Sequence, residues 1–410
     1  MPCIHQHSKH TNLMNVILHI GEGKTGTTSI QSYLSSARSL LREEGILYLT
    51  PSSALNHVCL AARLGAGVRV SPDNLSEMRA TCDQLFDKLK IYASDSSVRS
   101  IVISVENIFG ATPNLVLSYL QNYFDVDCVH VVAYIRDPIS QYISRMQQMV
   151  KASFLIVPPH RYMRDVASPV IRWIDKIGLD RVHIKPFFRK GLIGEDVVCD
   201  FLSQICSISD IDAFTQRKFA AAVDSTASNA GINVEQMSIA QSFRRIVYPS
   251  LNNVLQRRST RLIRFFEAMN SHGALGSKPR LDPAISSVIA TNNLPFVTSL
   301  VKLFPCFSVM HDIMLQVGDG NEGDVLDSEK RLISVADLFS DCSPSALNLY
   351  RFLCLPIAAK NKAPSDYLET LGSHLKRCNS PEGVSAHIYA HARKAVALAV
   401  DKGLPQVQSF

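Results

Sequence analysis

The 410-residue sequence predicts an α/β fold in which helices flank a doubly wound parallel sheet. Three observations lead to this prediction: short runs of β-branched and apolar residues, helical periodicity between those runs, and regular alternation of the two over residues 15–210. Continuous apolar strands are typical of a parallel sheet that is covered on both faces. Alternation of strand and helix is typical of the doubly wound class.

Four segments have the composition of buried strands. VILHI (16–20), IVISV (101–105) and VHVVAYI (129–135) are short β-branched runs, and VHIKPFF (182–188) is a weaker example. Runs of this length without polar alternation favour strands in the interior of a sheet. We therefore expect these four segments to form the central part of the fold.

Helical periodicity follows the first and third of these strands. Apolar residues recur at spacings of three and four over residues 30–41 and again over 139–150. From 211 to 310 strand patterns fade and helical ones dominate. QVGDGNEGD (316–324) has the composition of a linker, and the residues after it again have helical patterns.

These patterns divide the chain into consecutive segments. We expect residues 1–14 to be a disordered extension and 15–310 to form one domain, with an α/β core at 15–210 and a mainly helical part at 211–310. Residues 325–410 are expected to form a helical C-terminal region whose role the sequence leaves open.

Composition is that of a soluble, cytoplasmic enzyme. Hydrophobic residues make up 46% and charged residues 19%. We find no apolar run near the roughly 18 residues of a membrane-spanning helix, and the polar N-terminus lacks the apolar core of a signal peptide. The ten cysteines contain no C-x-x-C pair, so we expect neither a zinc site nor a disulfide framework. A net charge of +6 is too small to indicate nucleic-acid binding.

Positive charge is nevertheless concentrated in one window. No acidic residue lies between Glu235 and Glu267. Two interpretations remain open: a solvated helix face, or a surface that receives an anionic substrate. The arginines of the window are Arg244, Arg245, Arg257, Arg258, Arg261 and Arg264.

The first strand leads into HIGEGKTGTTSIQ (19–31). Its GKT has the ending of an ATP-binding Walker A loop, but Leu18 stands where that motif needs its first glycine. A loop between a strand and a helix still presents backbone N–H groups and the positive end of the helix dipole to an anion. Gly26 lets the backbone turn close to such a ligand, and Lys24 adds a positive charge. The hydroxyl donors of the loop are Thr25, Thr27, Thr28 and Ser29.

Two motifs together resemble one enzyme family. The strand–KTGTTS–helix pattern resembles the 5′-phosphosulfate loop of sulfotransferases that use 3′-phosphoadenosine 5′-phosphosulfate, especially the bacterial branch. YIRDPISQYIS (134–144) resembles their 3′-phosphate motif, R-x-P-x-x-x-x-x-S, with Arg136 and Ser144 eight residues apart and Ser140 between them as a further donor. A guanidinium and a hydroxyl suit the dianionic 3′-phosphate that distinguishes this nucleotide from ATP.

The resemblance implies a P-loop-like fold and a nucleotide-binding transferase that needs no metal. It places Lys24 at the leaving-group oxygen and Glu106, at the end of the strand before the 3′-phosphate motif, as the general base. The family delivers an aromatic ring to the adenine after the next strand, which here implies Phe187 or Phe188. Lys24 and the loop hydroxyls would hold the phosphosulfate.

The sequence contains one further partial motif and two histidines that bear on the site. FRKGLIG (188–194) resembles an R-K-G-x-x-G element that cytosolic members place near their C-terminus, but here it follows Arg136 by only 53 residues, so we interpret Arg189 and Lys190 as a coincidental match. His19 is expected to be a buried, hydrogen-bonded histidine. His57 remains open as a second candidate base.

The expected reaction is carbohydrate sulfation or a related transfer, in which the acceptor is a hydroxyl or amine of a glycan, glycolipid or small metabolite. This acceptor is expected to be anionic. Nucleic acid is not expected as a partner, whereas peripheral contact with membrane lipids and homodimer formation stay open. One alternative is a P-loop kinase or other nucleoside triphosphatase with Asp137 as a magnesium ligand. The other is a degenerate sulfotransferase fold that acts as an interaction module through residues 325–410.

Overall fold

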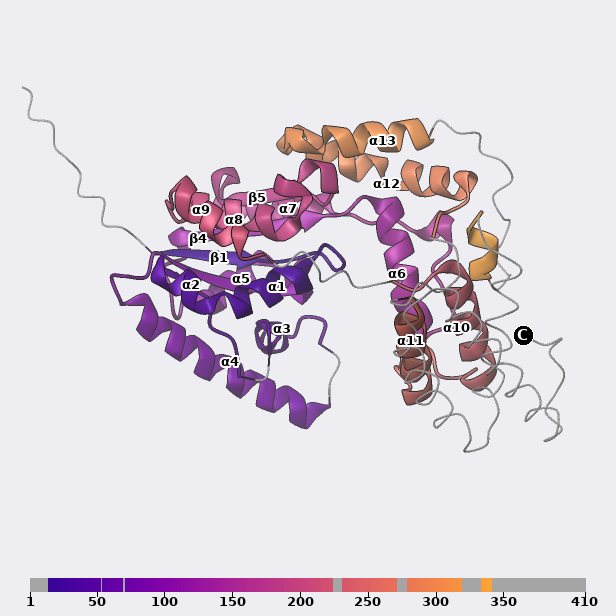
Figure 1. The fold of residues 1–410 in the computed structure, drawn as a ribbon, viewed down its shortest axis with the longest axis horizontal. Coiled ribbons are helices and arrows are strands. Elements are labelled where there is room, and N and C mark those ends of the chain that lie inside the picture. Colours follow the sequence, from indigo (N-terminus) through magenta and orange to yellow (C-terminus); the bar gives the residue numbers. More distant parts are fainter. Residues whose placement is uncertain are drawn as a thin grey trace, which may run out of the picture. The chain divides into compact units, whose positions relative to one another are not determined.

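A computed structural model of the chain contains a five-stranded parallel sheet with the order β2-β3-β1-β4-β5, flanked by helices (Figure 1). The predicted α/β class is thereby confirmed. The structure describes residues 14–52, 54–68, 71–223, 231–270, 279–318 and 333–340. The strands are β1 (Asn15–His19), β2 (Ile46–Leu47), β3 (Ser100–Ser104), β4 (Val129–Ile135) and β5 (Val182–Pro186).

The four expected strands are all present, and β2 is an additional strand of two residues. β1 is central, because it pairs with β3 on one side and β4 on the other. His19 is opposite Ser104 in the first pair and opposite Val132 in the second. The carboxyl ends of these parallel strands therefore meet at one edge of the sheet, where α/β proteins bind their ligands.

Thirteen α-helices accompany the sheet in the described part of the chain, and several begin at residues that cap a helix well. Ser71 caps α4 ahead of Pro72, and the Asp196 side chain accepts hydrogen bonds from the first turn of α8. Asn233 and Gln236 form a reciprocal capping box at the start of α10. The helices are α1 (Thr27–Ser36), α2 (Arg38–Glu43), α3 (Val58–Arg63), α4 (Pro72–Ala93), α5 (Pro113–Leu120), α6 (Pro138–Ala152), α7 (Ala167–Ile177), α8 (Val197–Ile208), α9 (Ala213–Ala221), α10 (Val234–Val247), α11 (Arg257–Asn270), α12 (Pro283–Leu303) and α13 (Ser308–Gly318).

The chain divides into two compact units that are not continuous in sequence. The first comprises the described residues within Met1–Asp137, Arg164–Ala227 and Pro295–His311, and it contains the sheet. The second contains Pro138–Met163, so α6 does not belong with the α/β core that the sequence placed at 15–210. The physical reason is the apolar face of α6, which packs against α10 and α11 in the core of the second unit.

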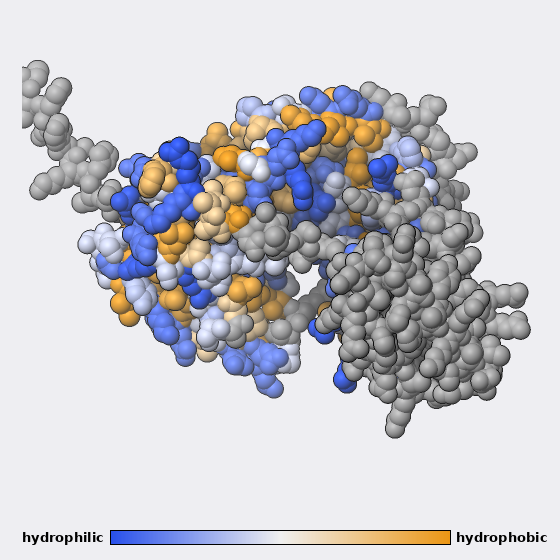
Figure 2. All heavy atoms as spheres, viewed as in Figure 1, coloured by the Kyte–Doolittle hydropathy of each residue, from blue (hydrophilic) through white to orange (hydrophobic). Residues whose placement is uncertain are grey.

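Each unit has its own apolar core. In the first, residues of the central strands, such as Ile17 and Val132, pack with Leu34 of α1 and Phe201 of α8. In the second, Tyr142 and other residues of α6 pack with α10, α11, α12 and the short 3-10 helix η8 (Val335–Leu338). On the face drawn in Figure 2, apolar residues are interspersed with hydrophilic ones over α4 and the elements beside it.

Among the described residues, one helix has the length and composition of a membrane-spanning segment. The 21 residues of α12 have a mean hydropathy of 1.3 over their most apolar window. Asn293, within this helix, is fully buried, and its amide donates to the carbonyl oxygens of Tyr162 and Ile289. Side chains such as Ile289 and Leu300 are also fully buried, as in a core helix of a globular protein.

Parts of the sequence-based division lie outside the described residues. This applies to the extension expected at 1–14, apart from Met14, and to the helical region expected at 325–410, apart from residues 333–340. The linker expected at 316–324 begins within α13, which extends to Gly318.

Candidate functional site

The loops of the predicted site follow neighbouring strands at one edge of the sheet. The loop after β1 lies beside the end of β3, because the Val105 N–H donates to the His19 carbonyl oxygen at 2.9 Å. On the far side of β4, the Phe187 N–H donates to the carbonyl oxygen of Ile135 at 2.7 Å. Parallel pairing therefore brings the loop after β1, Glu106, Arg136 and Phe187 to one edge of the first unit.

The loop between β1 and α1 is fixed by its backbone conformation. Lys24 and Gly26 both have left-handed backbone angles, with φ of 72° and 76°. A Cβ atom on Gly26 would lie 2.6 Å from Cγ1 of Val197, so only glycine fits there. The Thr25 hydroxyl donates to the Glu22 carbonyl oxygen at 2.5 Å and closes the loop on itself.

The start of α1 has the features of an anion-binding site. No side chain caps this helix, and its first turn contains no acidic residue. The Thr27 hydroxyl is buried and has no hydrogen-bond partner among the described residues. Lys24 and Thr28 are exposed beside it. Uncapped N–H groups, an unpartnered hydroxyl and a nearby ammonium group fit an anionic group such as a phosphosulfate.

Arg136 lies against this loop. Its Nη1 donates to the Lys24 carbonyl oxygen at 3.2 Å, and its guanidinium carbon lies 5.8 Å from the ring centroid of Phe187. Burial lowers the pKa of the Arg136 guanidinium below its usual value. The first residue of the second sequence motif is thus in direct contact with the first motif.

Sequence reasoning missed Glu22, which is fully buried at the base of the loop. One carboxylate oxygen accepts from the Arg136 backbone N–H at 2.9 Å, and the other forms an ion pair with Arg164. Burial raises the pKa of Glu22 to about 7, although Arg164 and the Arg136 N–H both favour the charged form. The available signal was an acidic residue between two glycines of an otherwise cationic loop, because such a carboxylate must be neutralised or paired.

Glu106 and Ser144 occupy different units. Glu106 begins the short 3-10 helix η1 (Glu106–Ile108), two residues beyond β3, and is half-buried. Ser144 is buried within α6 and belongs to the second unit, as does Ser140, whereas Arg136 belongs to the first. The two ends of the second sequence motif, Arg136 and Ser144, therefore belong to different units.

Both histidines considered from the sequence are buried. His19 Nδ1 is 2.8 Å from the Ser104 hydroxyl, as expected for a hydrogen-bonded core histidine, and burial lowers its pKa to about 3. His57 Nε2 is 2.9 Å from the Leu49 carbonyl oxygen, while its Nδ1 accepts from the Ser104 N–H at 3.1 Å. Burial lowers the pKa of His57 to about 4. With both ring nitrogens engaged, His57 has no free nitrogen for an acceptor proton.

The residues after β5 differ in exposure. Phe187 packs against the core of the first unit, whereas Phe188 is exposed, as are Arg189 and Lys190 in the short 3-10 helix η5 (Arg189–Gly191). Phe188 therefore has the more accessible ring for stacking on a base.

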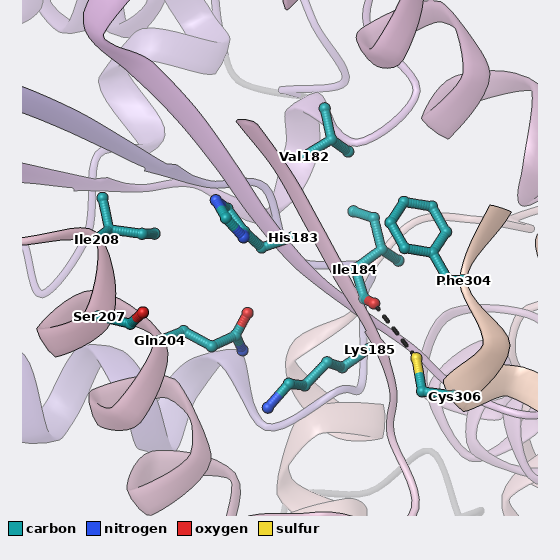
Figure 3. Close-up of a pocket in the computed structure, with 9 residues that line it drawn as sticks. All are labelled: Val182, His183, Ile184, Lys185, Gln204, Ser207, Ile208, Phe304 and Cys306. Carbon is teal, nitrogen blue, oxygen red and sulfur yellow. Dashed lines mark hydrogen bonds between the residues drawn. The ribbon is translucent and has the colours of Figure 1, made fainter. Parts of the chain in front are cut away.

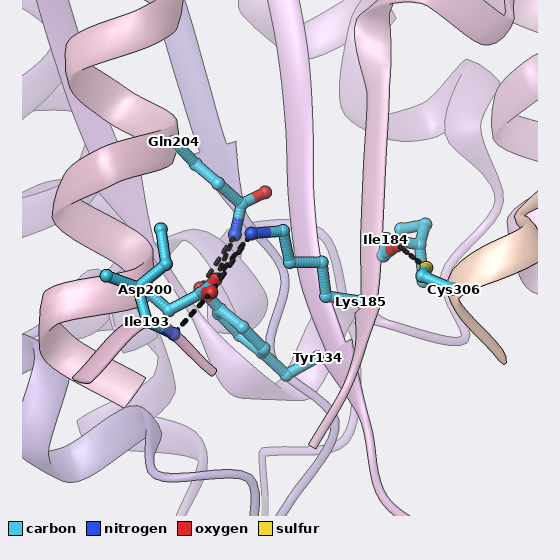
Figure 4. A network of polar contacts seen from close by, with 7 residues as sticks. All are labelled: Tyr134, Ile184, Lys185, Ile193, Asp200, Gln204 and Cys306. Carbon is cyan, nitrogen blue, oxygen red and sulfur yellow. Dashed lines mark hydrogen bonds and ion pairs between the residues drawn. The ribbon is translucent and has the colours of Figure 1, made fainter. Parts of the chain in front are cut away.

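A buried polar network holds the segment that follows η5 (Figure 4). The Asp200 carboxylate accepts from the Tyr134 hydroxyl at 2.8 Å, from Lys185 Nζ at 3.0 Å and from the Ile193 N–H at 3.2 Å. Gln204 adds a further hydrogen bond to the same carboxylate. The network links β4, β5 and α8, and no sequence motif indicates it because its members come from separate elements.

The arginine-rich window does not form one surface. Arg244 is fully buried and donates to the Ala152 carbonyl oxygen at 2.5 Å and to the Leu251 carbonyl oxygen, so its role is structural. Both sequence interpretations fail for this residue. Of the other arginines, Arg245, Arg257, Arg258 and Arg264 are exposed.

A cavity of about 290 Å³ lies along the outer strand β5 (Figure 3). Val182, His183, Ile184 and Lys185 of β5 contribute to its wall, together with residues from the end of α8 and with Phe304 and Cys306. None of the residues proposed from the sequence lines it, so it is separate from the candidate site.

Comparison with protein-family models, with curated proteins and with solved structures gave no match to this chain. Among the described residues, no group of three or more His, Cys, Asp or Glu side chains is arranged to hold a metal ion.

Proposed function

We propose that this chain is a sulfotransferase that moves a sulfuryl group from 3′-phosphoadenosine 5′-phosphosulfate to a hydroxyl or amine of a glycan, glycolipid or related anionic metabolite. The nucleotide, when bound, supplies an activated sulfuryl group. The uncapped start of α1 and the unpartnered Thr27 hydroxyl support an anion at this position. The strand order, with the loop after the central strand, supports the finer assignment to a P-loop-like fold.

One observation carries the proposal: the Arg136 guanidinium contacts the Lys24 carbonyl oxygen. An arginine and an anion-binding loop that meet in this way offer two cationic groups to one nucleotide. Arg136 would bind the 3′-phosphate through its guanidinium, while Thr25, Gly26, Thr27, Thr28 and Ser29 surround the phosphosulfate. Phe188, or the less exposed Phe187, would stack on the adenine.

Two side chains would carry the chemistry. The Lys24 ammonium would stabilise negative charge at the bridging oxygen of the leaving group. The Glu106 carboxylate would accept the proton of the attacking hydroxyl or amine. Catalysis of group transfer at a charged centre depends mainly on such positioning and charge stabilisation.

The proposal is tested by calorimetry with 3′-phosphoadenosine 5′-phosphate and with adenosine 5′-phosphate. Wild-type protein should bind the first more tightly. Arg136→Ala should weaken that binding by about 2–4 kcal/mol, because the 3′-phosphate loses its charged partner, and should leave binding of adenosine 5′-phosphate nearly unchanged. Arg172→Ala, at an exposed arginine of α7, is the matched control. Equal affinity of the wild type for both nucleotides would refute the proposal.

The kinase alternative is separated in the same experiment. A P-loop kinase that used Asp137 as a magnesium ligand would bind ATP with magnesium in preference to the 3′-phosphorylated nucleotide. A degenerate fold that served only as an interaction module would bind neither. The occupied nitrogens of His57 and the intact Lys24–Arg136 contact favour the sulfotransferase assignment with Glu106 as base.

A further inference from the structure

The turn between α10 and α11 presents a cluster of exposed apolar side chains. Leu255 is 67% exposed, Val254 48% and Leu251 42%. Leu155 is 47% exposed. It lies two residues after Ser153, whose hydroxyl donates to the Asn252 side chain of the same turn at 3.0 Å. Apolar residues scattered singly on a surface need no explanation, but a cluster on one turn marks an interaction site.

This turn is held in shape by hydrogen bonds from a buried side chain. The buried Arg244 guanidinium donates to the Leu251 carbonyl oxygen on one side of the turn and to the Ser259 hydroxyl, at 3.2 Å, on the other. The Tyr248 ring lies 4.9 Å from the same guanidinium. Asn253 has a left-handed φ of 61°, which reverses the chain between the apolar residues. The apolar side chains are therefore displayed by a fixed backbone.

Exposed cations flank the apolar cluster. Arg245 lies near the end of α10, and Arg257 and Arg258 begin α11. The start of a helix is the end at which its dipole disfavours positive charge, so these two arginines are placed against the preference of the helix. No acidic residue lies between Glu235 and Glu267 to neutralise them in the local sequence.

We propose that residues 245–258, here called the docking tip, bind the surface of an anionic lipid bilayer. Leu251, Val254 and Leu255 would enter the boundary between headgroups and acyl chains, and the arginines would contact lipid phosphates. Nucleic acid would also attract the arginines, but it offers no apolar interior for the exposed leucines and valine. The inference goes beyond sulfuryl transfer and does not depend on it.

Vesicle flotation with the full-length protein tests the proposal. Wild type should float with vesicles that contain phosphatidylglycerol and not with pure phosphatidylcholine. Each lipid-facing arginine contributes about fivefold, so Arg257→Ser/Arg258→Ser should weaken binding by about 25-fold. Leu251→Ser/Leu255→Ser should weaken it at least as much. Arg172→Ser/Lys176→Ser on α7 and Ile91→Ser on α4 remove exposed residues of the same kinds elsewhere and should bind as wild type does.

A tryptophan reporter distinguishes insertion from simple adsorption. The chain contains one tryptophan, Trp173, which is buried in the first unit. The emission of Leu255→Trp should shift to the blue on anionic vesicles and should be quenched by brominated acyl chains. Wild-type binding that is absent, or equal on neutral and anionic vesicles, would overturn the proposal. So would tip variants that bind like wild type, a reporter that neither shifts nor is quenched, or binding to duplex DNA in place of vesicles.

Discussion

Two glutamates follow neighbouring strands of the sheet, and their surroundings give them different roles. Glu22, after β1, is fully buried and paired with Arg164 and the Arg136 N–H. Glu106, after β3, is half-buried at the same edge. A paired, buried carboxylate positions the backbone around it, whereas a partly exposed one is available to an acceptor. We therefore keep Glu106 as the proposed base and treat Glu22 as a positioning residue.

Glu106→Gln tests the assignment of the base. The amide keeps the shape and one acceptor oxygen but cannot take a proton, so kcat should fall by about 10²–10⁴ with saturating donor and acceptor. Affinity for 3′-phosphoadenosine 5′-phosphate should remain that of wild type, because Glu106 would contact the acceptor. Retention of more than about a tenth of wild-type kcat would show that another group takes the proton. His57 is not that group, since both of its ring nitrogens are engaged.

At the scale of the element, the shape of the loop before α1 depends on Gly26 more than on Gly23. Gly26→Ala should place a methyl group 2.6 Å from Val197 Cγ1 at a left-handed φ, and should thereby distort the start of α1. Gly23→Ala is the matched control, because its Cβ would have no atom within 4 Å. We expect calorimetry to show at least tenfold weaker nucleotide binding for the first variant and near wild-type binding for the second, a difference of about 1.4 kcal/mol or more.

Similar losses in both glycine variants would mean that loop flexibility, and not the close contact at Gly26, decides binding. Similar retention in both would mean that the loop does not bind the nucleotide. A thermal melt of each variant separates these outcomes from a general loss of folding, because Gly26 also contacts α8 through Val197.

Elements were predictable from the sequence where a local pattern determines them. The β-branched strands β1, β3 and β4 were recognised, and so was the loop that follows β1. β2 was missed because two residues carry no periodicity. The membership of α6 was missed because an amphipathic pattern shows that one face is buried, but not which partner buries it.

The residues of the candidate site were also predictable only where they stand in a local motif. Lys24 and Arg136 stand in recognisable motifs, and the structure brings them into contact. Glu22, Asp200 and the buried Arg244 acquire their roles only from partners distant in sequence, such as Arg164 for Glu22. Local patterns contain no information about such pairings, and a charged residue is assigned to the surface by default.

At the scale of the whole molecule, the chain leaves the first unit after Asp137 and returns to it at Arg164. The Glu22 carboxylate accepts a hydrogen bond from the Arg136 backbone and pairs with the Arg164 side chain. It therefore connects the two segments of the first unit that end at Asp137 and begin at Arg164. The protonation state of Glu22 should therefore influence the stability of the first unit.

Three buried groups give that stability a specific pH dependence. The folded-state pKa values of His19 and His57 are lowered to about 3 and about 4, so these histidines stay neutral in the folded protein while the unfolded chain binds protons near pH 6.5. Each therefore removes stability as the pH falls below about 6.5. Glu22 acts in the opposite direction, because its pKa is raised from 4.5 to about 7 and the folded state binds its proton first. Its protonation adds stability as the pH falls over this range.

Urea unfolding of the first unit can be followed by Trp173 fluorescence over the range from pH 6.5 down to 4.5. It should separate the contribution of the histidines to stability from that of Glu22. Glu22→Gln removes the compensating proton, so its stability should fall more steeply than that of wild type, by up to about 1.4 kcal/mol per pH unit. His57→Gln removes one of the destabilising protons, so its stability should fall less steeply by a similar amount. Curves that run parallel for the three proteins would show that these side chains titrate alike in the folded and unfolded states, which would contradict the pKa shifts caused by burial.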